Sequence, residues 1–234
     1  MKIGVISDVH GNLPALESVM AAAKEEGIDM WLVLGDLVGY YYSPSEVVNL
    51  VRELNGYTIA GNHDRIALAV ARGESNPDAL RKKYGSGHQI AVEQLDSTQM
   101  SWLADLPDTF DVNISGCSVH LCHGAPWNPV EYIYPDSPKS TWQKFTHLKR
   151  DAVFYGHSHY ANARFVEGTL VLNPGSVGQP RDRQGGAQWA IWNTDSRSFN
   201  LRRERYDVRL VQAMCKLHDP HIAYLSDVLD CHAR

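Results

Sequence analysis

Five apolar segments of this chain are each followed within two residues by Asp, Asn or His. The segments span residues 2–7, 30–34, 57–60, 118–122 and 152–155, and their length and composition are typical of buried strands. The polar residues that follow them are Asp8 and His10, Asp36, Asn62 to Asp64, His123, and His157 and His159. The carboxyl ends of strands in an open α/β sheet form the ligand crevice, so these side chains are expected to converge. Together they predict a dinuclear metal site.

The first half of the sequence has the pattern of a βαβαβ unit. Asn12 can cap a helix with Pro14 in its first turn, and apolar residues repeat at helical spacing up to Gly27. A second helix is expected between residues 43 and 56. Both helices connect nearly continuous apolar runs, as in a parallel sheet that is buried on both faces. From residue 64 to residue 106 the helical pattern is interrupted, which predicts a helical cap beside the crevice.

The second half is expected to be mainly antiparallel, with one helix. Three pairs of alternating segments form hairpins around Ser115-Gly116, Glu167-Gly168 and a polar turn after Asn193. Residues 207–234 are expected to form two short helices. The first of these helices has one apolar face, which consists of Leu210, Val211, Met214 and Leu217. This face is expected to pack on the rest of the protein, and the alternative is a homo-oligomer contact.

Length and composition favour one domain over residues 1–234. A chain of 234 residues with 44% hydrophobic content can bury a sizeable core, and no Gly/Ser/Pro-rich linker divides it. The net charge of −5 argues against a dedicated nucleic-acid surface that neutralises phosphates. A small anionic substrate would then need a local positive charge, which metal ions supply.

The sequence also predicts a cytoplasmic protein without a membrane span. The four cysteines, Cys117, Cys122, Cys215 and Cys231, are too few and too scattered for a disulfide framework, and are expected to be reduced. Met1-Lys2 leads directly into the first strand, which leaves no room for a signal peptide, and no apolar run approaches about 18 residues.

The order of the motifs adds more than each motif alone. D-x-H, then G-D, G-N-H-D, a single His and G-H-x-H resembles the calcineurin-like metallophosphoesterase superfamily over residues 1 to about 195. The resemblance implies a four-layer αββα sandwich with a di-metal centre between the sheets. It also implies the ligands, which are Asp8, His10 and His159 for the first metal, Asn62, His123 and His157 for the second, and Asp36 as the bridge.

These ligand types also point to particular metals and to a reaction. Mixed carboxylate, amide and imidazole ligands suit Mn²⁺, which we favour, with Fe, Zn, Ni or Co as alternatives. Two metals about 3.5–4 Å apart can lower the pKa of a bridging water and clamp the attacking and leaving oxygens of a displacement. The expected reaction is therefore hydrolysis of a phosphate ester.

His63 adjoins Asn62 but is not assigned to a metal. The resemblance gives it the role of protonating the leaving alkoxide or stabilising transition-state charge, and the alternative is that it only orients a ligand. Asp64 is interpreted as a helix cap or as a partner of a ligand. The remaining histidines, His88, His120, His147, His218, His221 and His232, are interpreted as structural or surface residues.

Departures from better-known branches narrow the substrate. In Ser/Thr protein phosphatases and symmetrical dinucleoside-tetraphosphate hydrolases the bridging Asp opens a G-D-x-x-D-R-G motif, and an Arg precedes the Asn-His pair. Here those positions are Gly39-Tyr40 and Ala60. The loss of two arginines disfavours a dianionic monoester and favours a diester. The segment G-D-L-V-G-Y and residues 173–181 resemble the small bacterial and archaeal phosphodiesterase-like branch.

Two interpretations of residues 173–181 remain open. The segment can simply form a tight loop, or it can return to the crevice, where Arg181 would bind substrate together with Tyr40, Asn62 and His63. Further aromatic side chains follow the ligand motifs, and rim packing is favoured over nucleobase stacking for them. They are Tyr40, Tyr41, Tyr42, Trp127, Tyr132 and Tyr134.

The leading hypothesis is a di-metal phosphodiesterase acting on a small or nucleotide diester. A phosphomonoesterase or a nuclease of the same fold is the alternative within enzymes, although a nuclease would be expected to carry a basic groove. The alternative of another class is a non-catalytic metal-binding scaffold. Such a scaffold would be expected to have lost ligands, and the sequence lacks none.

Overall fold

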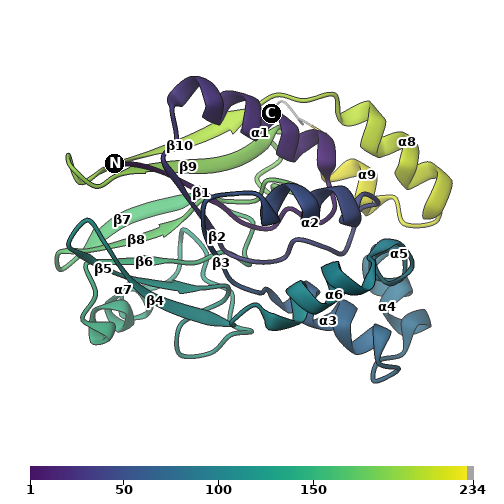
Figure 1. Ribbon diagram of the computed structural model, residues 1–234, viewed down its shortest axis with the longest axis horizontal. Helices are drawn as coiled ribbons and strands as arrows, with labels where there is room; N and C mark the ends of the chain where they lie inside the picture. The colour runs from purple at the N-terminus through teal and green to yellow at the C-terminus, as the bar shows by residue number, and fades with distance from the viewer. Residues whose placement is uncertain (231–234) are drawn as a thin grey trace.

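The computed structural model describes residues 1–230, in which two five-stranded sheets face each other (Figure 1). The first sheet has the order β10-β9-β1-β2-β3, and its strands in chain order are β1 Lys2–Ile6, β2 Met30–Val33, β3 Gly56–Thr58, β9 Ala187–Asn193 and β10 Ser198–Glu204. The second has the order β4-β5-β6-β8-β7, formed by β4 Thr109–Ile114, β5 Cys117–Cys122, β6 Ala152–Phe154, β7 Asn162–Val166 and β8 Thr169–Asn173. Residues 231–234, which include Cys231 and His232 and end the expected C-terminal helical segment, lie outside the described residues.

Parallel strands form the centre of both sheets. β1 pairs in parallel with β2, and β2 with β3. In the second sheet β5, β6 and β8 are parallel, so the expectation of a mainly antiparallel second half holds only for the three hairpins. The last hairpin, β9-β10, joins the first sheet instead, because β9 pairs antiparallel with the free side of β1. Each sheet therefore sends several strand ends in one direction.

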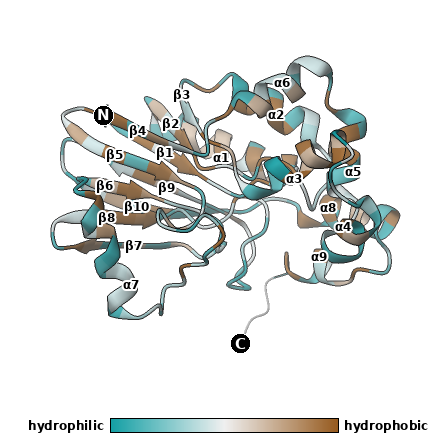
Figure 2. Cartoon of the chain, turned by 90° about the horizontal axis from the view of Figure 1, so that it is seen from below, coloured by the Kyte–Doolittle hydropathy of each residue, from teal (hydrophilic) through white to brown (hydrophobic). Residues whose placement is uncertain are grey.

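A hydrophobic core lies between the two sheets. It is built from the inward side chains of β1, β2 and β9 on one side and of β5, β6 and β8 on the other. Phe154 of β6 meets Trp192 of β9 across the interface, with ring centroids 5.2 Å apart. Figure 2 shows the apolar residues concentrated along the strands. This packing fixes the position of one sheet relative to the other.

Helices cover the outer faces and complete a sandwich. Helix α1 (Leu13–Glu26) and helix α2 (Pro44–Arg52) pack on the first sheet. Asn12 caps α1 by accepting a hydrogen bond from the backbone N–H of Ala15 at 3.2 Å. The outer face of the second sheet is covered by the short helix α7 (Lys139–Gln143) and a 3₁₀ helix, η1 (Lys144–Leu148), whose Trp142 and Phe145 pack there with Ala125 and Ile133 of the loop after β5.

Four further helices follow β3, and two more follow β10. The first four, in the segment with the interrupted helical pattern, are α3 Asn62–Ala71, α4 Pro77–Tyr84, α5 Gly87–Gln94 and α6 Ser97–Asp105. Near the end of the described chain are α8 Val208–His218 and α9 Tyr224–Asp227. Val211 of α8 is buried, but Leu210, Met214 and Leu217 are exposed, so the helix packs through only part of its expected face. The oligomer contact expected there stays a prediction.

No helix among residues 1–230 has both the length and the apolar character that crossing a membrane requires.

We predict that Phe154→Ala lowers the free energy of unfolding by about 3–5 kcal/mol, because it leaves a cavity between the sheets. Urea denaturation of the metal-free protein measures the effect. Phe165→Ala is the matched control, since Phe165 on β7 is 56% exposed, and its cost should stay below about 1 kcal/mol. Equal losses in the two variants would contradict a core between the sheets.

Candidate metal centre

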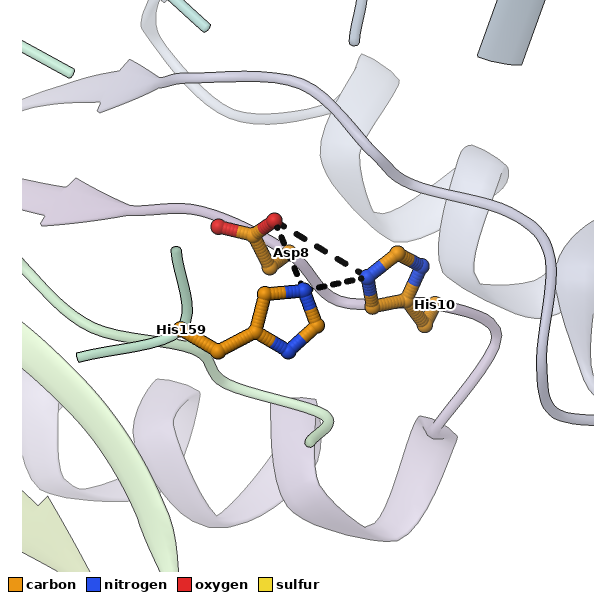
Figure 3. Close-up of side chains that lie close together, drawn as sticks. All are labelled: Asp8, His10 and His159. Carbon is orange, nitrogen blue, oxygen red and sulfur yellow. Dashed lines mark hydrogen bonds and ion pairs between the residues drawn. The ribbon is translucent and has the colours of Figure 1, made fainter. Parts of the chain in front are cut away.

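Two groups of buried Asp and His side chains lie at the carboxyl ends of the parallel strands. In each group one ligand atom per residue lies within 4.8 Å of the others, a spacing that can hold a metal ion. The first group is Asp8, His10 and His159, and the second is Asp36, His123 and His157. Figure 3 shows the first group, in which both imidazoles point toward the Asp8 carboxylate. Residues from both sheets contribute to both groups.

Backbone carbonyls orient three of the imidazoles. Because a carbonyl oxygen can only accept a hydrogen bond, each contacting Nδ1 must carry the proton, which leaves the Nε2 lone pair for the site in a neutral ring. The three contacts are His10 to Val38 at 3.1 Å, His123 to Leu34 at 2.7 Å and His159 to Gln179 at 2.7 Å. This pattern is typical of metal-binding histidines.

The Nε2 atoms of His10 and His159 lie 3.1 Å apart in the protein interior. In neutral rings with protonated Nδ1 atoms, both lone pairs would face each other at that distance. The arrangement is stable only with a positive charge between them, which is either a proton or a metal cation. Asp8 Oδ1 lies 3.2 Å from His159 Nε2 and 3.8 Å from His10 Nε2, so a carboxylate oxygen faces the same point.

Asp36 lies between the two groups. Its Oδ2 atom is 3.1 Å from His123 Nε2 in the second group and 3.8 Å from His10 Nε2 in the first. Its Oδ1 atom accepts a hydrogen bond from the backbone N–H of His63 at 2.7 Å, which fixes the carboxylate at the start of α3. Asp36 therefore lies between the groups, and Asp8 Oδ1 also approaches the second group, at 3.9 Å from His123 Nε2.

Four buried polar atoms of the candidate ligands have no hydrogen-bond partner among the described residues. They are Asp8 Oδ1, Asn62 Oδ1, His123 Nε2 and His157 Nε2. Leaving such atoms unpaired costs about 1–3 kcal/mol each, so a cluster of them indicates a missing ligand. Asn62 lines the same cavity as His123 of the second group, and its role as a ligand stays a prediction. The donor set of oxygen and imidazole nitrogen fits a divalent transition metal.

The protonation states also fit a cation site. Burial raises the pKa of Asp8, but nearby His159 and His123 outweigh it and hold that pKa below its usual range. Burial lowers the pKa of His10 to about 3, so this ring is neutral at neutral pH. Burial also lowers the pKa of His123, but Asp36 more than offsets this and raises it to about 10, so metal binding there must release a proton.

The candidate ligand residues have an unusual backbone conformation. Five of them have positive φ angles, namely Asp8 at 56°, His10 at 54°, Asp36 at 54°, His157 at 69° and His159 at 62°. A non-glycine residue in this conformation costs about 1–3 kcal/mol of folding free energy, so it persists only where surrounding contacts hold it. Hydrogen bonds between the loops do so here, including Asp8 N to Gly35 O at 3.0 Å and His10 N to Asp36 O at 2.9 Å.

Two glycines of the motifs permit the close approach of these loops. A Cβ at Gly61 would lie 2.1 Å from Asp36 Oδ1, and one at Gly156 would lie 2.0 Å from Ser7 Oγ and 2.9 Å from Asp8 Oδ2. Any side chain at these positions would displace a ligand carboxylate. The glycines in G-N-H-D and G-H-x-H are therefore steric requirements of the site.

Asp64 holds two loop segments together, which confirms its interpretation as a cap and a partner of a ligand. Its Oδ2 atom accepts from the backbone N–H groups of Gly61 at 2.8 Å and Asp36 at 2.9 Å. Its Oδ1 atom accepts from Leu37 at 2.8 Å and Val38 at 3.2 Å. The carboxylate thus positions both Asp36 and the start of α3.

The segment 173–181 returns to the site. Gly178 N donates to the backbone oxygen of Asp8 at 3.0 Å, and Arg181 N donates to that of His159 at 3.2 Å. The Arg181 guanidinium donates to the Tyr40 hydroxyl at 3.3 Å, and its Nε atom has no partner among the described residues. The Tyr40 ring lies 4.7 Å from those of His10 and His63. Arg181 and Tyr40 therefore border the first group.

The expected rim position is wrong for Tyr41 and Tyr42. Both are buried by the C-terminal segment, and their hydroxyls donate to Leu225 O at 3.1 Å and to Asp219 Oδ2 at 3.0 Å. Burying these polar aromatic side chains requires such partners, which α8 and α9 bring. These two tyrosines attach the C-terminal segment to the site loop and do not face a substrate.

The aromatic residues after His123 divide into two kinds. Trp127 packs edge-to-face on Phe145 with centroids 5.0 Å apart, as rim packing would require. The Tyr132 ring instead covers His157, with centroids 3.9 Å apart and planes 24° apart, and Tyr134 stacks on Tyr132. Tyr132 and Tyr134 are both exposed, so the outer face of this pair is open to solvent.

His88 is a site residue that the sequence interpretation missed. It is buried, and its Nε2 atom lies 3.0 Å from Nδ1 of His63. The sequence offered only a weak signal, a His directly after Ser86-Gly87 in the helical segment, 25 residues from its partner. His120 is a structural residue as expected, because its Nδ1 atom pairs with Asp111 at 2.9 Å on neighbouring strands.

Comparison with known proteins gives consistent matches. A family model described as the calcineurin-like phosphoesterase superfamily domain matches residues 1–197. An uncharacterized protein of Methanocaldococcus jannaschii is 34% identical over 228 residues, which cover 88% of this chain and 88% of that protein. A phosphodiesterase of the same organism is 24% identical over 183 residues, which cover 75% of this chain and 83% of the relative.

Solved structures share the architecture over nearly the whole chain. A metallophosphoesterase from Sphaerobacter thermophilus superposes with a TM-score of 0.80 at 28% identity, covering 97% of this chain and 98% of that one. A hypothetical protein from Pyrococcus horikoshii OT3 superposes with a TM-score of 0.84 at 22% identity, covering 100% and 99%. Because the identity to the Pyrococcus horikoshii protein is only 22%, this second match shows a shared fold alone.

We predict that Asp64→Asn lowers the free energy of unfolding by about 2–4 kcal/mol, because an amide cannot accept all four backbone hydrogen bonds and turns an N–H group toward donors. Urea denaturation of the metal-free protein measures the change. Asp136→Asn is the matched control, since Asp136 is exposed, and its effect should lie within about 0.5 kcal/mol. A change of that small size at Asp64 as well would show that the carboxylate does not hold the loops.

Proposed function

The chain belongs to the calcineurin-like phosphoesterase superfamily, and on that basis we propose that it is a di-metal phosphodiesterase. The observation that carries the proposal is the position of Asp36 Oδ2, which faces His10 of one buried group and His123 of the other. A carboxylate between two cation sites is what a dinuclear centre requires. The phosphodiesterase among the relatives supports the reaction class.

We propose the ligands that the sequence predicted. The first ion would be held by Asp8, His10 and His159, and the second by Asn62, His123 and His157, with Asp36 between them. The four unpaired buried atoms of these residues support this assignment. We propose Mn²⁺ as the native metal because carboxylate, amide and imidazole ligands without thiolate suit it.

Bound ions would supply an activated water as the nucleophile and neutralise the charge of the phosphate oxygens. His63 would protonate the leaving oxygen, because it adjoins Asn62 and its Nε2 atom has no hydrogen-bond partner among the described residues. Burial holds the pKa of His63 well below its usual range, and the negative charge of a bound phosphate opposes that effect. Proton donation requires that His63 carry a proton on Nε2 when the substrate is bound.

Arg181 and Tyr40 would bind the phosphate on the side of the first group. Arg181 is the cation beside the first group, and Gly39-Tyr40 and Ala60 stand where other branches have arginines. Arg65 lines the cavity beside the second group, but its guanidinium pairs with Asp108 at 2.8 Å. One guanidinium suits a singly charged diester better than a dianionic monoester.

A cavity beside the second group supports the diester preference. Its volume is about 360 Å³, and Asn62 and His123 form the wall nearest the proposed metals. Mainly apolar side chains form the rest, among them Ala125, Pro126 and Val130. A monoester has no second ester group to place there. We therefore propose that the cavity holds the ester group that stays on the phosphate.

Three further points concern the domain organisation, the cellular location and the alternative of a non-catalytic scaffold. We propose one structural unit over residues 1–234, because the core between the sheets includes side chains from β1 to β9. We propose the cytoplasm as its location, because Cys117, Cys122 and Cys215 are free buried thiols in the described part of the chain. A scaffold function is disfavoured because the ligand set is complete.

We predict about two Mn²⁺ ions per chain in the wild-type protein. Asp36→Ala should lower the content below one, because both sites lose a ligand, whereas His10→Ala should mainly empty the first site. Elemental analysis after dialysis measures the content. His120→Ala is the matched control, since this histidine lies on β5 and pairs with Asp111, and it should keep both ions. One ion per chain in the wild type, or two in Asp36→Ala, would contradict the bridge.

We predict that kcat/KM falls from bis(4-nitrophenyl) phosphate to methyl 4-nitrophenyl phosphate and again to 4-nitrophenyl phosphate. The three share a leaving group, so the first step reports the cavity and the second reports the diester preference. Val130→Trp should narrow the cavity and lower kcat/KM about 10-fold for the bis-aryl diester only, equivalent to about 1.4 kcal/mol.

Leu210→Trp is the matched control, because Leu210 is exposed on α8 away from the cavity. Equal or faster hydrolysis of the monoester would overturn the diester preference. If Val130→Trp lowered kcat/KM equally for the methyl and the bis-aryl diester, the proposal that the cavity holds the retained ester group would be wrong.

A further inference from the structure

A hydrogen bond between two buried histidines lies beside the proposed metal ligands. Nδ1 of His63 and Nε2 of His88 are 3.0 Å apart. Their ring planes differ by only 12°, and their centroids are 4.9 Å apart. The centroids lie farther apart than the two nitrogens, so the rings meet through their edges and the nitrogens point at each other. Because this contact occupies Nδ1 of His63, Nε2 is the ring nitrogen that remains for another partner.

The surroundings of His63 leave its ring little freedom. Tyr40 and Tyr84 approach it with centroid distances of 4.7 and 4.8 Å, and His10 approaches at 4.9 Å. These aromatic contacts limit the tilt of the ring but do not select which nitrogen faces the site. Only a hydrogen-bonding partner at one nitrogen can do that. Among the described residues, His88 is the partner of Nδ1.

The start of α5 is held firmly enough to position His88. Asp219 accepts hydrogen bonds from the backbone N–H and the hydroxyl of Ser86, at 2.9 and 2.7 Å. The same Oδ2 atom accepts from Tyr42 at 3.0 Å. Gly87 lies against the backbone of Tyr40, where an added Cβ would lie 2.5 Å from its nitrogen. The C-terminal segment and the loop after β2 thus fix the residue before His88.

Gly39 provides the space for the histidine pair. A Cβ at this position would lie 2.7 Å from His63 Nδ1 and 3.0 Å from His88 Nε2, and the φ angle of +86° favours glycine. This is the position where the G-D-x-x-D-R-G motif has an acidic residue. In this chain His88, which is 25 residues from His63 in the sequence, contacts His63 in the space that a side chain at position 39 would occupy.

We propose that His88 is a positioning residue that holds His63 with its Nε2 atom toward the leaving group. The inference rests on the proposed role of His63 as the proton donor. In the charged ring, Nδ1–H donates to His88 Nε2. As the bond from phosphorus to the leaving oxygen breaks, the proton on Nε2 passes to that oxygen, and Nδ1 keeps its proton and its bond to His88. A neutral, correctly oriented His63 remains.

The test is a double-mutant cycle with two leaving groups. His88→Phe keeps a ring but removes the acceptor, and it should lower kcat about 10- to 100-fold on diphenyl phosphate with little change in KM. The loss should be much smaller on bis(4-nitrophenyl) phosphate, whose leaving group needs less protonation. His88→Gln offers an amide oxygen and should recover part of the rate. In the His63→Ala background, His88→Phe should have no further effect.

Two controls separate this inference from the proposed function. Nitrogen NMR of histidine-labelled, metal-free protein reports the proton on His63 Nδ1, and His88→Phe should change that signal without affecting metal content. If His63→Ala keeps full activity, the proposed proton-donor role is wrong. The NMR measurement would still show whether His63 Nδ1 is hydrogen-bonded to His88. Equal losses on both leaving groups, a further loss in the His63→Ala background, or an unchanged His63 signal would each overturn the positioning role.

Discussion

Two imidazole nitrogens that face each other at 3.1 Å inside the protein set the main constraint on this structure. His10 and His159 come from opposite sheets, so closing the sandwich brings these two nitrogens together, and a positive charge between them would offset their repulsion. Other features of the site serve the same convergence. The candidate ligands adopt positive φ angles, and Gly61 and Gly156 lie where a side chain would clash with the site. Asp64 accepts hydrogen bonds from the backbone N–H groups of two loop segments. Burial makes the convergence costly, and a bound cation would offset that cost.

Much of this arrangement could be predicted from the sequence, because it depends on local signals. Apolar runs predicted the strands that precede each motif, and the parallel direction of β1 to β3 explains why Asp8, Asp36 and Asn62 lie at one edge. The pairing of β9 with β1 was missed for a physical reason. The sequence of a hairpin specifies its own turn and alternation, but not which sheet edge it joins, and here the free side of β1 decides.

The missed and misinterpreted side chains are those whose environment comes from distant segments. Tyr41 and Tyr42 follow a ligand motif, yet partners near Asp219 and Leu225 turn their hydroxyls away from the site. His88 carries no motif, and its importance arises only because Gly39 leaves space and Ser86 is fixed by the C-terminal segment. A chain of contacts therefore links the C-terminal helices to the proposed proton donor, a link that spacing and periodicity could not predict.

The central claim is that two cations share the Asp36 carboxylate. Anomalous diffraction from crystals grown with Mn²⁺ tests it most directly. The account predicts two peaks, one in contact with Asp8, His10 and His159 and the other with Asn62, His123 and His157, and both in contact with Asp36. A single peak, or two peaks with Asn62 or His157 directed away from the metal, would contradict it.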